Sequence, residues 1–428
     1  PHLELADRWF KSGLSILESE LSKQIYPDGV PSEQAVSYIL FVLNLNLNVW
    51  RLAELNHLEV PEIWQERLCE ACEFIKNIID INGYVPEFGD SDDGLVIRLD
   101  NSSSYNKYRS ILVSGAIICD RPDFKLAAGC WDETNHWLFG EEGMYKYKNL
   151  PDTGFESFSK SFSFGGYSSM KSNGNALLFD HAPLGYLSTA AHGHADALSL
   201  WLTSNGNPIL VDAGTYAYQE GGKWRAYFRG TSAHNTVRIN KKDQSENHGT
   251  FLWGKKAKSK LLKWESNHDF DLAVAEHDGY KKFGIIHRRA VMFIKPDVIL
   301  VEDSISGNGP YSVEQLWHFP GNCRLEIRKE LVRIELNGMK YWLWHGQPAI
   351  EIDIRIINGQ ESPPQGWISE RYGSIQPAPV LCYGGELLLP ARISIGFYLN
   401  QAVSEGEIAG IMNQALDFQR EIRTGEFN

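Results

Sequence analysis

The sequence predicts an α+β protein with two domains, the first helical and the second built of antiparallel β-strands. Three observations support this. Apolar residues recur at helical spacing from residue 1 to about 140. From about residue 155 they alternate with polar residues, which is the two-residue period of a strand. Three Asn-Gly pairs, a strong hairpin signal, stand between β-prone runs in this second part. We therefore expect domains at residues 1–140 and 155–428.

The first domain is predicted to be an array of helical hairpins. Aliphatic residues at helical spacing mark a first helix, which ends before the Pro- and Gly-rich segment 26–34. Segment 36–52 carries two apolar stripes, so we expect it to be buried among other helices on most sides. Further helices are expected over "EIWQERLCEACEFIKNIID" (62–80) and "KYRSILVSGAIICD" (107–120).

The second domain is predicted to consist of stacked antiparallel sheets. Three of its Asn-Gly pairs, at 173–174, 205–206 and 337–338, lie between β-prone runs. Around the third pair, Val332, Ile334 and Leu336 alternate with polar residues before the turn. Trp342 and Trp344 alternate after it, as core-facing residues of a strand would.

Charge and hydropathy exclude some classes of partner. The net charge of −13 argues against nucleic acid, because phosphate binding needs a basic surface. The apolar run "ILFVLNLNLNVWRLAEL" is interrupted by three Asn residues and Arg51, and it falls short of the roughly 20 apolar residues that cross a bilayer. We expect no membrane span.

One short stretch is basic despite the overall charge. Between residues 223 and 242 there is no acidic residue, and an anionic ligand of modest size could bind there. A solvated run of charges is the alternative. Arg225 and Arg229 are the candidate substrate-binding residues in this stretch.

The cysteines are not expected to form a disulfide framework. There are six in 428 residues. Cys69 and Cys72 form a C-x-x-C inside a predicted helix, and no second pair is placed to complete a zinc site, so both are expected to fill the core.

The segment "AAHGHADALSLWLTSNGNPILVDAGTYAY" (190–218) concentrates residues that carry chemistry. It holds His192, His194 and Asp212, and "SAHNTV" adds His234 downstream. Imidazole and carboxylate groups are ordinary zinc ligands. Hydrogen bonds that fasten a loop to a sheet are the alternative role. If 205–206 is a two-residue turn, His194 would lie about 16 Å from Asp212 along an extended strand, so a metal site requires "AAHGHAD" to curl back as a loop.

Several ordered blocks together resemble the heparinase II/III-like polysaccharide lyases, which include alginate lyases of related fold. These blocks are "QIYPDGVPSEQAVSY", "HGHADALSLWL", "GNPILVDAGTYAY", "YFRGTSAHNTVRIN" and "DQSENHGTF". The resemblance covers nearly the whole chain. It implies an incomplete α/α toroid followed by a sandwich-like antiparallel β domain.

The resemblance also implies roles for individual residues. His194, Asp212 and His234 match the family's zinc-binding set, a structural site near the cleft, and His192 matches the active-site histidine. Tyr38 aligns with the catalytic tyrosine of the toroid. Tyr216 and Tyr227 are both candidates for a second catalytic tyrosine.

The implied reaction is β-elimination at a uronic acid of a polysaccharide or oligosaccharide, which leaves a 4,5-unsaturated sugar. A base removes the C5 proton and the C4 oxygen departs, while hydrogen-bond donors stabilise the developing charge. Tyr38 is expected to protonate the leaving oxygen and could also be the base. His192 is expected to be the base or the partner of the uronate carboxylate. A tyrosine can give or take a proton if cationic neighbours lower its pKa.

The sequence departs from the family pattern at one point. Family members carry an asparagine, often followed by a histidine, on a helix upstream of the tyrosine, and residues 1–37 contain no matching pair. A non-catalytic polysaccharide-binding or assembly protein is therefore one alternative. A glycoside hydrolase using Asp28 and Glu33 is another, although Asp28 precedes Gly29 in a predicted turn.

The compartment and the oligomeric state stay open at this level. The resemblance favours the periplasm or secretion, whereas six unpaired cysteines would suit a reducing cytoplasm. Relatives of this kind are often dimers, so a homodimer is one expectation.

Overall fold

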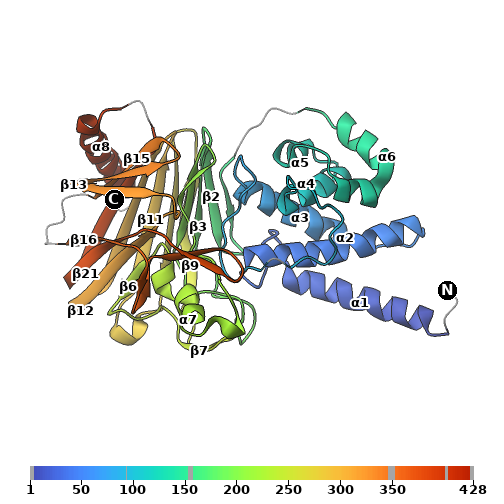
Figure 1. Ribbon diagram of the computed structural model, residues 1–428, viewed down its shortest axis with the longest axis horizontal. Coiled ribbons are helices and arrows are strands. Elements are labelled where there is room, and N and C mark those ends of the chain that lie inside the picture. The colour runs from blue at the N-terminus through green and yellow to red at the C-terminus, as the bar shows by residue number, and fades with distance from the viewer. Residues whose placement is uncertain (1–3, 93, 153–157, 346–351, 401–402, 425–428) are drawn as a thin grey trace.

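The computed structural model describes residues 4–92, 94–152, 158–345, 352–400 and 403–424. The helical domain and the β domain lie side by side, with a five-stranded sheet facing the helices (Figure 1). The predicted fold class is confirmed. The predicted domain limits at residues 1, 155 and 428 lie outside the described residues, and the described chain passes from the last helix of the first part, ending at Asn149, to a strand beginning at Lys160.

The helical domain consists of six α-helices and a single 3-10 turn within its described residues. They are α1 (Ala6–Gln24), η1 (Val36–Tyr38), α2 (Ile39–Leu55), α3 (Glu62–Ile78), α4 (Lys107–Ile118), α5 (Pro122–Ala128) and α6 (Glu133–Asn149). Their buried faces share one apolar core. The long segment between α3 and α4 runs toward the β domain and carries part of the site described below.

Helix α2 packs in the helical core along its first apolar stripe and, through Val42 and Val49, along part of the second. Leu40, Leu43 and Leu47 pack in the helical core, as the first of the two stripes predicts. Leu45 and Leu52 of the second stripe are 44% and 60% exposed, so the expectation of burial on most sides was wrong. Contrary to the length argument from the sequence, residues Val36–Leu55 are long and apolar enough to cross a membrane by length and composition, with 39% of the most apolar window buried. One such helix is weak evidence for a span, because the core helix of a folded domain passes the same test. Packing of α2 against the other helices accounts for the buried apolar face.

The β domain contains two large antiparallel sheets. The five-stranded sheet has the order β1-β2-β3-β4-β5 and the ten-stranded sheet the order β13-β14-β15-β21-β12-β11-β10-β9, with β16 paired to β21 and β6 to β12. The strands of the first sheet are β1 (Lys160–Phe162), β2 (Tyr167–Ser172), β3 (Asn175–Asp180), β4 (Leu200–Ser204) and β5 (Asn207–Leu210).

The ten-stranded sheet is built on two long paired strands, β12 (Val298–His318) and β21 (Val380–Tyr398). Its other strands are β6 (Val237–Ile239), β9 (Ser259–Ser266), β10 (Phe270–His277), β11 (His287–Ile294), β13 (Arg324–Arg328), β14 (Leu331–Leu336), β15 (Met339–His345) and β16 (Asp353–Ile357). Three two-stranded ribbons complete the domain: β7 (Asn247–Gly249) with β8 (Leu252–Trp253), β17 (Gln360–Glu361) with β18 (Pro364–Gln365), and β19 (Trp367–Arg371) with β20 (Ser374–Pro377).

The Asn-Gly pairs at 173–174, 205–206 and 337–338 form the predicted hairpin turns. Both residues of each pair have positive φ, as a two-residue turn matched to the strand twist requires. The turns join β2 to β3, β4 to β5 and β14 to β15.

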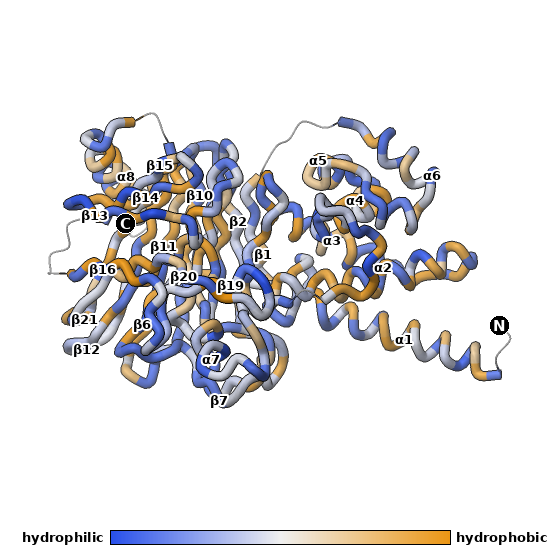
Figure 2. The backbone as a smooth tube through the Cα atoms, in the orientation of Figure 1, coloured by the Kyte–Doolittle hydropathy of each residue, from blue (hydrophilic) through white to orange (hydrophobic). Residues whose placement is uncertain are grey.

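The molecule is layered as helices, five-stranded sheet, ten-stranded sheet and a single C-terminal helix, α8 (Glu405–Thr424) (Figure 1). Leu177 and Phe179 of β3 pack against the ten-stranded sheet, whereas Leu178 between them packs against the helical domain. Trp342 and Trp344 are buried, as predicted, in the core that α8 shares with the ten-stranded sheet. Figure 2 shows the hydrophobic strands in the interior of the sandwich.

The remaining short elements border the junction of the two domains. They are η2 (Gln219–Gly221), α7 (Lys223–Arg229) and η3 (Thr231–Ala233). A further turn, η4 (Lys281–Phe283), lies between β10 and β11 and packs against Tyr311 of β12. The region of α7 and β7 is largely hydrophilic in Figure 2.

One cysteine prediction was wrong. Cys69 of α3 forms a disulfide with Cys119, which directly follows α4 and lies 50 residues away in sequence. The packing of α3 against α4 brings the two Cα atoms to 5.9 Å, a proximity that no local pattern reveals. Cys72 is a buried free thiol, as expected. The suggestion of a reducing compartment rested on six unpaired cysteines, and this disulfide removes that basis.

Denatured protein kept free of reductant is expected to titrate with four thiols, those of Cys72, Cys130, Cys323 and Cys382. A count of six would contradict the disulfide. Replacing Cys69 and Cys119 together by Ser should lower the free energy of unfolding by roughly 2–4 kcal/mol, because the open chain gains entropy. The matched control is Cys130→Ser, which removes an exposed free thiol and should leave stability unchanged.

Candidate active site and metal centre

The candidate site lies where four segments of the two domains meet. The helical domain contributes η1 with Tyr38 and the segment after α3 with Asp90 and Asp92. The β domain contributes the loop before β4 with His192 and the loop after β5 with Tyr218. Loops held by a rigid scaffold are the usual carriers of catalytic groups.

The segment around Asp90 is fixed by backbone contacts on both sides. Ser37 Oγ donates a hydrogen bond to the Asp90 carbonyl (3.0 Å), and the Asp90 amide donates to the His192 carbonyl (2.9 Å). Gly89 has φ +70°, and a Cβ there would lie 2.2 Å from the carbonyl oxygen of Gln34. Glycine is therefore required where this segment passes η1.

Tyr38 and Tyr218 meet hydroxyl to hydroxyl above a carboxylate. Their hydroxyl groups are hydrogen-bonded to each other, and Oδ2 of Asp92 lies 3.3 Å from the Tyr38 hydroxyl and 3.2 Å from the Tyr218 hydroxyl. The Tyr38 ring also packs edge-on against the His192 ring, with centroids 4.8 Å apart. Two phenols and an imidazole thus share one partly exposed surface.

Both phenols are harder to ionise than free tyrosine. Burial raises the pKa of Tyr38, and the charges of Asp92 and Asp90 add to the rise, while the hydrogen bond to Tyr218 opposes it. Burial and the hydrogen bond to Tyr38 raise the pKa of Tyr218. The condition of a pKa lowered by cationic neighbours is not met, because burial, chiefly, and the nearby aspartates raise the pKa of both phenols.

His192 is oriented by a buried carboxylate. Its Nδ1 lies 3.1 Å from Oδ2 of Asp90, whose side chain is fully buried, while the His192 side chain remains 27% exposed. Gly193 follows, and a Cβ at that position would lie 1.5 Å from the carbonyl oxygen of Leu184. Only glycine allows the loop to place His192 and His194 on either side of this contact.

Within the described residues, His194, Asp212 and His234 form a buried group able to hold a metal. One potential ligand atom from each residue lies within 4.8 Å of the others. The loop containing "AAHGHAD" curls back to reach Asp212, as this grouping requires. Burial lowers the pKa of His194 to about 4, which keeps the ring neutral, as a metal ligand must be.

Two orphaned nitrogens show that the group fits a metal. Nδ1 of His194 and Nε2 of His234 are buried and have no hydrogen-bond partner. Their other ring nitrogens are used: Nε2 of His194 lies 3.0 Å from Asp90, and Nδ1 of His234 lies 2.7 Å from Asp212. A cation at this point would satisfy both lone pairs.

Asn235 places His234 in this group. It is fully buried, and its Nδ2 donates to the carbonyls of Leu200 (2.7 Å) and Val211 (2.8 Å), at the ends of the two strands that flank the site. Its Oδ1 accepts the backbone N–H of His318 at 2.6 Å. The "SAHN" motif therefore fastens the His234 loop to three neighbouring segments.

Neither predicted substrate-binding arginine is free for a ligand. Arg225 is paired through both terminal nitrogens with Asp90, with Nη2 2.7 Å from Oδ2. Arg229 donates to the carbonyls of Gly249 (2.6 Å) and Thr250 (2.7 Å), and burial lowers its pKa to about 10. Both guanidinium groups are buried, and their contacts are internal.

The structure places neither predicted second tyrosine at Tyr38. The Tyr227 side chain is buried, and its hydroxyl lies 3.5 Å from the carbonyl of Trp367. Tyr216 packs against Phe228. Tyr218, in the same "GTYAY" stretch, takes the position beside Tyr38, because the β19–β20 ribbon binds Tyr216 through its backbone, including the bond from Gly373 N–H to the Tyr216 carbonyl (2.6 Å).

Asp28 has a structural role. Its Oδ2 accepts the backbone N–H groups of Phe164 (2.7 Å) and Gly165 (3.0 Å) in the turn between β1 and β2. Asp28 thus fastens the helical domain to the five-stranded sheet. It is therefore not available as a catalytic carboxylate of the Asp28–Glu33 pair considered for a glycoside hydrolase.

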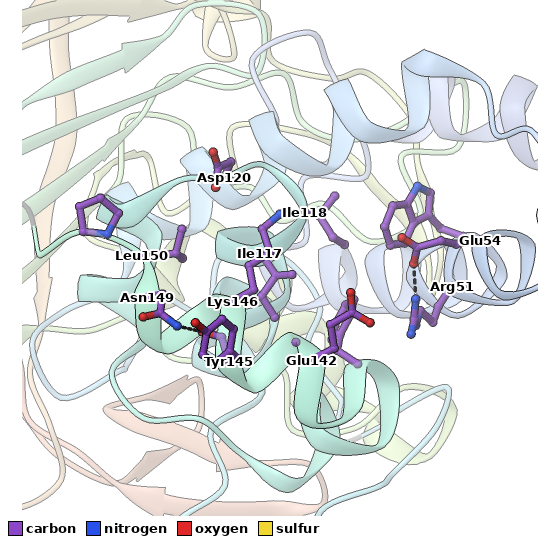
Figure 3. A pocket seen from close by; sticks show the side chains of 14 residues that line it. Arg51, Glu54, Ile117, Ile118, Asp120, Glu142, Tyr145, Lys146, Asn149 and Leu150 are labelled. Atoms are coloured by element: carbon purple, nitrogen blue, oxygen red, sulfur yellow. Dashed lines mark hydrogen bonds and ion pairs between the residues drawn. The ribbon is translucent and has the colours of Figure 1, made fainter.

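A cavity of about 680 Å³ lies elsewhere, between α2, α4 and α6 (Figure 3). Arg51 points toward Glu54 there, and the two are ion-paired. None of the sequence-predicted site residues lines this cavity. The chemistry-bearing groups therefore lie at the domain junction, away from it.

Comparison with known proteins gives the same family over both domains. A profile described as "Heparinase II/III-like, C-terminal" matches residues 156–391, and "Heparinase II/III N-terminus" matches residues 1–114. The chain is 27% identical to a heparin-sulfate lyase of Bacteroides thetaiotaomicron over 331 residues, which are 72% of this chain and 42% of that protein. It is 24% identical to a heparin-sulfate lyase of Bacteroides stercoris over 327 residues, 75% of this chain and 43% of that protein.

Solved structures share the fold. A heparan sulfate lyase from Pedobacter heparinus superposes with a TM-score of 0.71 at 21% identity, covering 95% of this chain and 58% of that one. A chondroitin AC lyase from Streptomyces coelicolor superposes with a TM-score of 0.51 at 11% identity, covering 93% and 58%. The chain spans less than half the length of the curated relatives that it matches. It belongs to the heparinase II/III-like family.

Proposed function

We propose that this chain carries the catalytic centre of a polysaccharide lyase that cleaves a uronate-containing glycosaminoglycan by β-elimination. The observation that carries the proposal is the meeting of Tyr38, Tyr218 and His192 on one partly exposed surface. Such a surface offers both a proton donor and a proton acceptor to a bound sugar.

The groups divide the proton transfers as follows. His192 donates its Nδ1–H to Asp90, which leaves Nε2 with a lone pair to accept the C5 proton. The C5–H electron pair forms the C4–C5 double bond, and the C4–O bond breaks. Tyr38 donates its proton to the departing oxygen. Its raised pKa keeps the phenol protonated until that moment.

Tyr218 is the proposed second tyrosine. Its hydroxyl bridges Tyr38 and Asp92, so it can steady the Tyr38 hydroxyl and relay a proton to it after each turnover. The Arg225 guanidinium lies 5.2 Å from the centre of the Tyr218 ring and 5.4 Å from that of Phe251, which restrains the Tyr218 side chain.

The substrate class is proposed from the relatives. Those described above are named as lyases of heparin or heparan sulfate, and a more distant structural neighbour holds chondroitin sulphate. A heparan-type glycosaminoglycan is therefore the first candidate. Alginate and bacterial exopolysaccharides are the uronate polymers to compare with it.

Zinc is proposed as a structural cofactor held by His194, Asp212 and His234. When bound, it would supply a cross-link between the loop before β4, the end of β5 and the start of β6. The support is the pair of buried, unpartnered nitrogens and the chemistry of the donor set.

Binding without cleavage is the second candidate function. Tight binding of a uronate polymer without any double-bond signal would decide for it.

Incubation with a panel of heparan sulfate, chondroitin sulfate and alginate is expected to raise the ultraviolet absorbance of a conjugated double bond on one of them. Tyr38→Phe should lower kcat/KM on that polymer by roughly 10²–10⁴-fold, because the proton donor is lost. The control is Tyr145→Phe, at an exposed tyrosine of the other cavity. Full turnover by Tyr38→Phe would overturn the assignment.

Tyr218→Phe should lower kcat on the same polymer by roughly 10²-fold, since the hydroxyl that contacts Tyr38 is removed. Tyr216→Phe is the neighbouring control and should retain kcat within about twofold, because the hydroxyl of Tyr216 is not at Tyr38. A reversed pattern would restore the sequence-based candidate.

Protein purified without chelators is expected to contain one zinc per chain by elemental analysis, and His234→Ala should lose it. Removal of zinc should also lower Tm, because a cation bound only by the folded state stabilises it. His268→Ala, at a fully exposed histidine, should keep both the zinc and the Tm. Zinc-free wild-type protein with an unchanged Tm after zinc addition would exclude the site.

A further inference from the structure

Asp90 is the point at which the proposed active site and the proposed metal site touch. Its carboxylate contacts His192 through Oδ2 and His194 through Oδ1, at 3.1 and 3.0 Å. Its side chain is fully buried, so no water competes for these contacts. Arg225 closes the group with two bonds to the same carboxylate.

The two imidazoles approach Asp90 through opposite nitrogens. His192 uses Nδ1, whereas His194 uses Nε2. A carboxylate paired with a guanidinium is ionised and can only accept hydrogen bonds, so each contacting nitrogen must carry the hydrogen. In a neutral ring the other nitrogen then holds the lone pair, which is Nε2 in His192 and Nδ1 in His194.

The lone pair on Nδ1 of His194 suits a metal ligand, and the lone pair on Nε2 of His192 suits a base. Nδ1 of His194 is buried and has no hydrogen-bond partner, and His194 groups with Asp212 and His234 as a possible metal site. His192 is the more exposed of the two rings and packs against Tyr38, on the proposed substrate side.

We propose that Asp90 is a positioning residue that sets the tautomers of His192 and His194 together, so that metal binding and proton abstraction depend on one carboxylate from the helical domain. This inference rests on the proposed function for its catalytic half. The part that concerns metal binding involves only His194, Asp212 and His234 and can be tested without turnover. Partners that orient a metal-bound histidine in this way are usually worth 10–100-fold in affinity or activity.

Asp90→Asn is the first test. The amide keeps the shape of the side chain, but its NH2 group is a donor and faces one of the two histidine nitrogens. That nitrogen can then no longer donate its own hydrogen to residue 90. Zinc affinity, measured by competition with a chromophoric chelator, should fall by roughly 10–100-fold, and kcat should fall by at least as much with KM little changed. Histidine-selective ¹⁵N NMR of the zinc-free protein should show altered tautomer signals for two rings.

Asp90→Asn has two effects that must be separated: it leaves the Arg225 guanidinium without its carboxylate, and it removes the acceptor that sets the tautomers of His192 and His194. Asp90→Asn combined with Arg225→Gln removes both charges of the buried pair. The double variant should recover Tm relative to Asp90→Asn alone, because no uncompensated guanidinium remains. It should not recover zinc affinity or kcat. Recovery of both would overturn the inference, since Asp90 would then act only to neutralise Arg225.

Asp100→Asn is the matched control. Asp100 is also buried in a loop of the helical domain, where it accepts the backbone N–H groups of Ser102 (2.7 Å) and Glu133 (3.3 Å). This variant should keep zinc affinity and histidine signals whatever its effect on Tm. If the wild type cleaves no polymer, the lyase proposal fails, but the zinc and NMR measurements still test the role of Asp90. Unchanged zinc affinity and unchanged histidine signals in Asp90→Asn would overturn the inference. Weaker zinc binding with altered histidine signals would support it.

Discussion

The buried carboxylate of Asp90 holds the two domains in the relation on which the candidate site depends. It comes from the helical domain, and all three of its side-chain partners belong to the β domain. Removing one partner of such a buried charge pair typically costs about 3–5 kcal/mol, because the remaining charge is uncompensated. The geometry of His192, and of Tyr38 beside it, is therefore tied to correct docking of the domains.

A second constraint holds the β half of the site. Asn235 joins the ends of β4 and β5 to the segment before β6, and Arg289 adds bonds to the carbonyls of Leu198 and Asn235 (2.6 and 2.5 Å). Arg289 is itself paired with Asp303, whose pKa is held low against the effect of burial by Arg289 and His287. The loops that carry His194 and His234 are thus fixed by a polar network inside the sandwich, which explains why short irregular segments can present a defined group.

Local pattern and family resemblance predicted different parts of this molecule. The hairpins followed from Asn-Gly pairs, because positive φ at two successive residues is a local requirement. The grouping of His194, Asp212 and His234 followed from the family resemblance. Asp90 and Tyr218 were missed, since their partners lie 102 and 180 residues away and meet them only once the domains have docked. "FGDSDDG" offers a turn signal but no indication of which aspartate is buried.

The five-stranded sheet is an interior layer, covered by the helices on one face and by the larger sheet on the other. Domain shuffling between family members would therefore be restricted at the connection between α6 and β1. A crossover there would join the helical domain of one protein to the β domain of another. The apolar contacts of β3 and the contacts of Asp90 would then both have to fit the new partner. The helical domain and the five-stranded sheet therefore act as one packing unit.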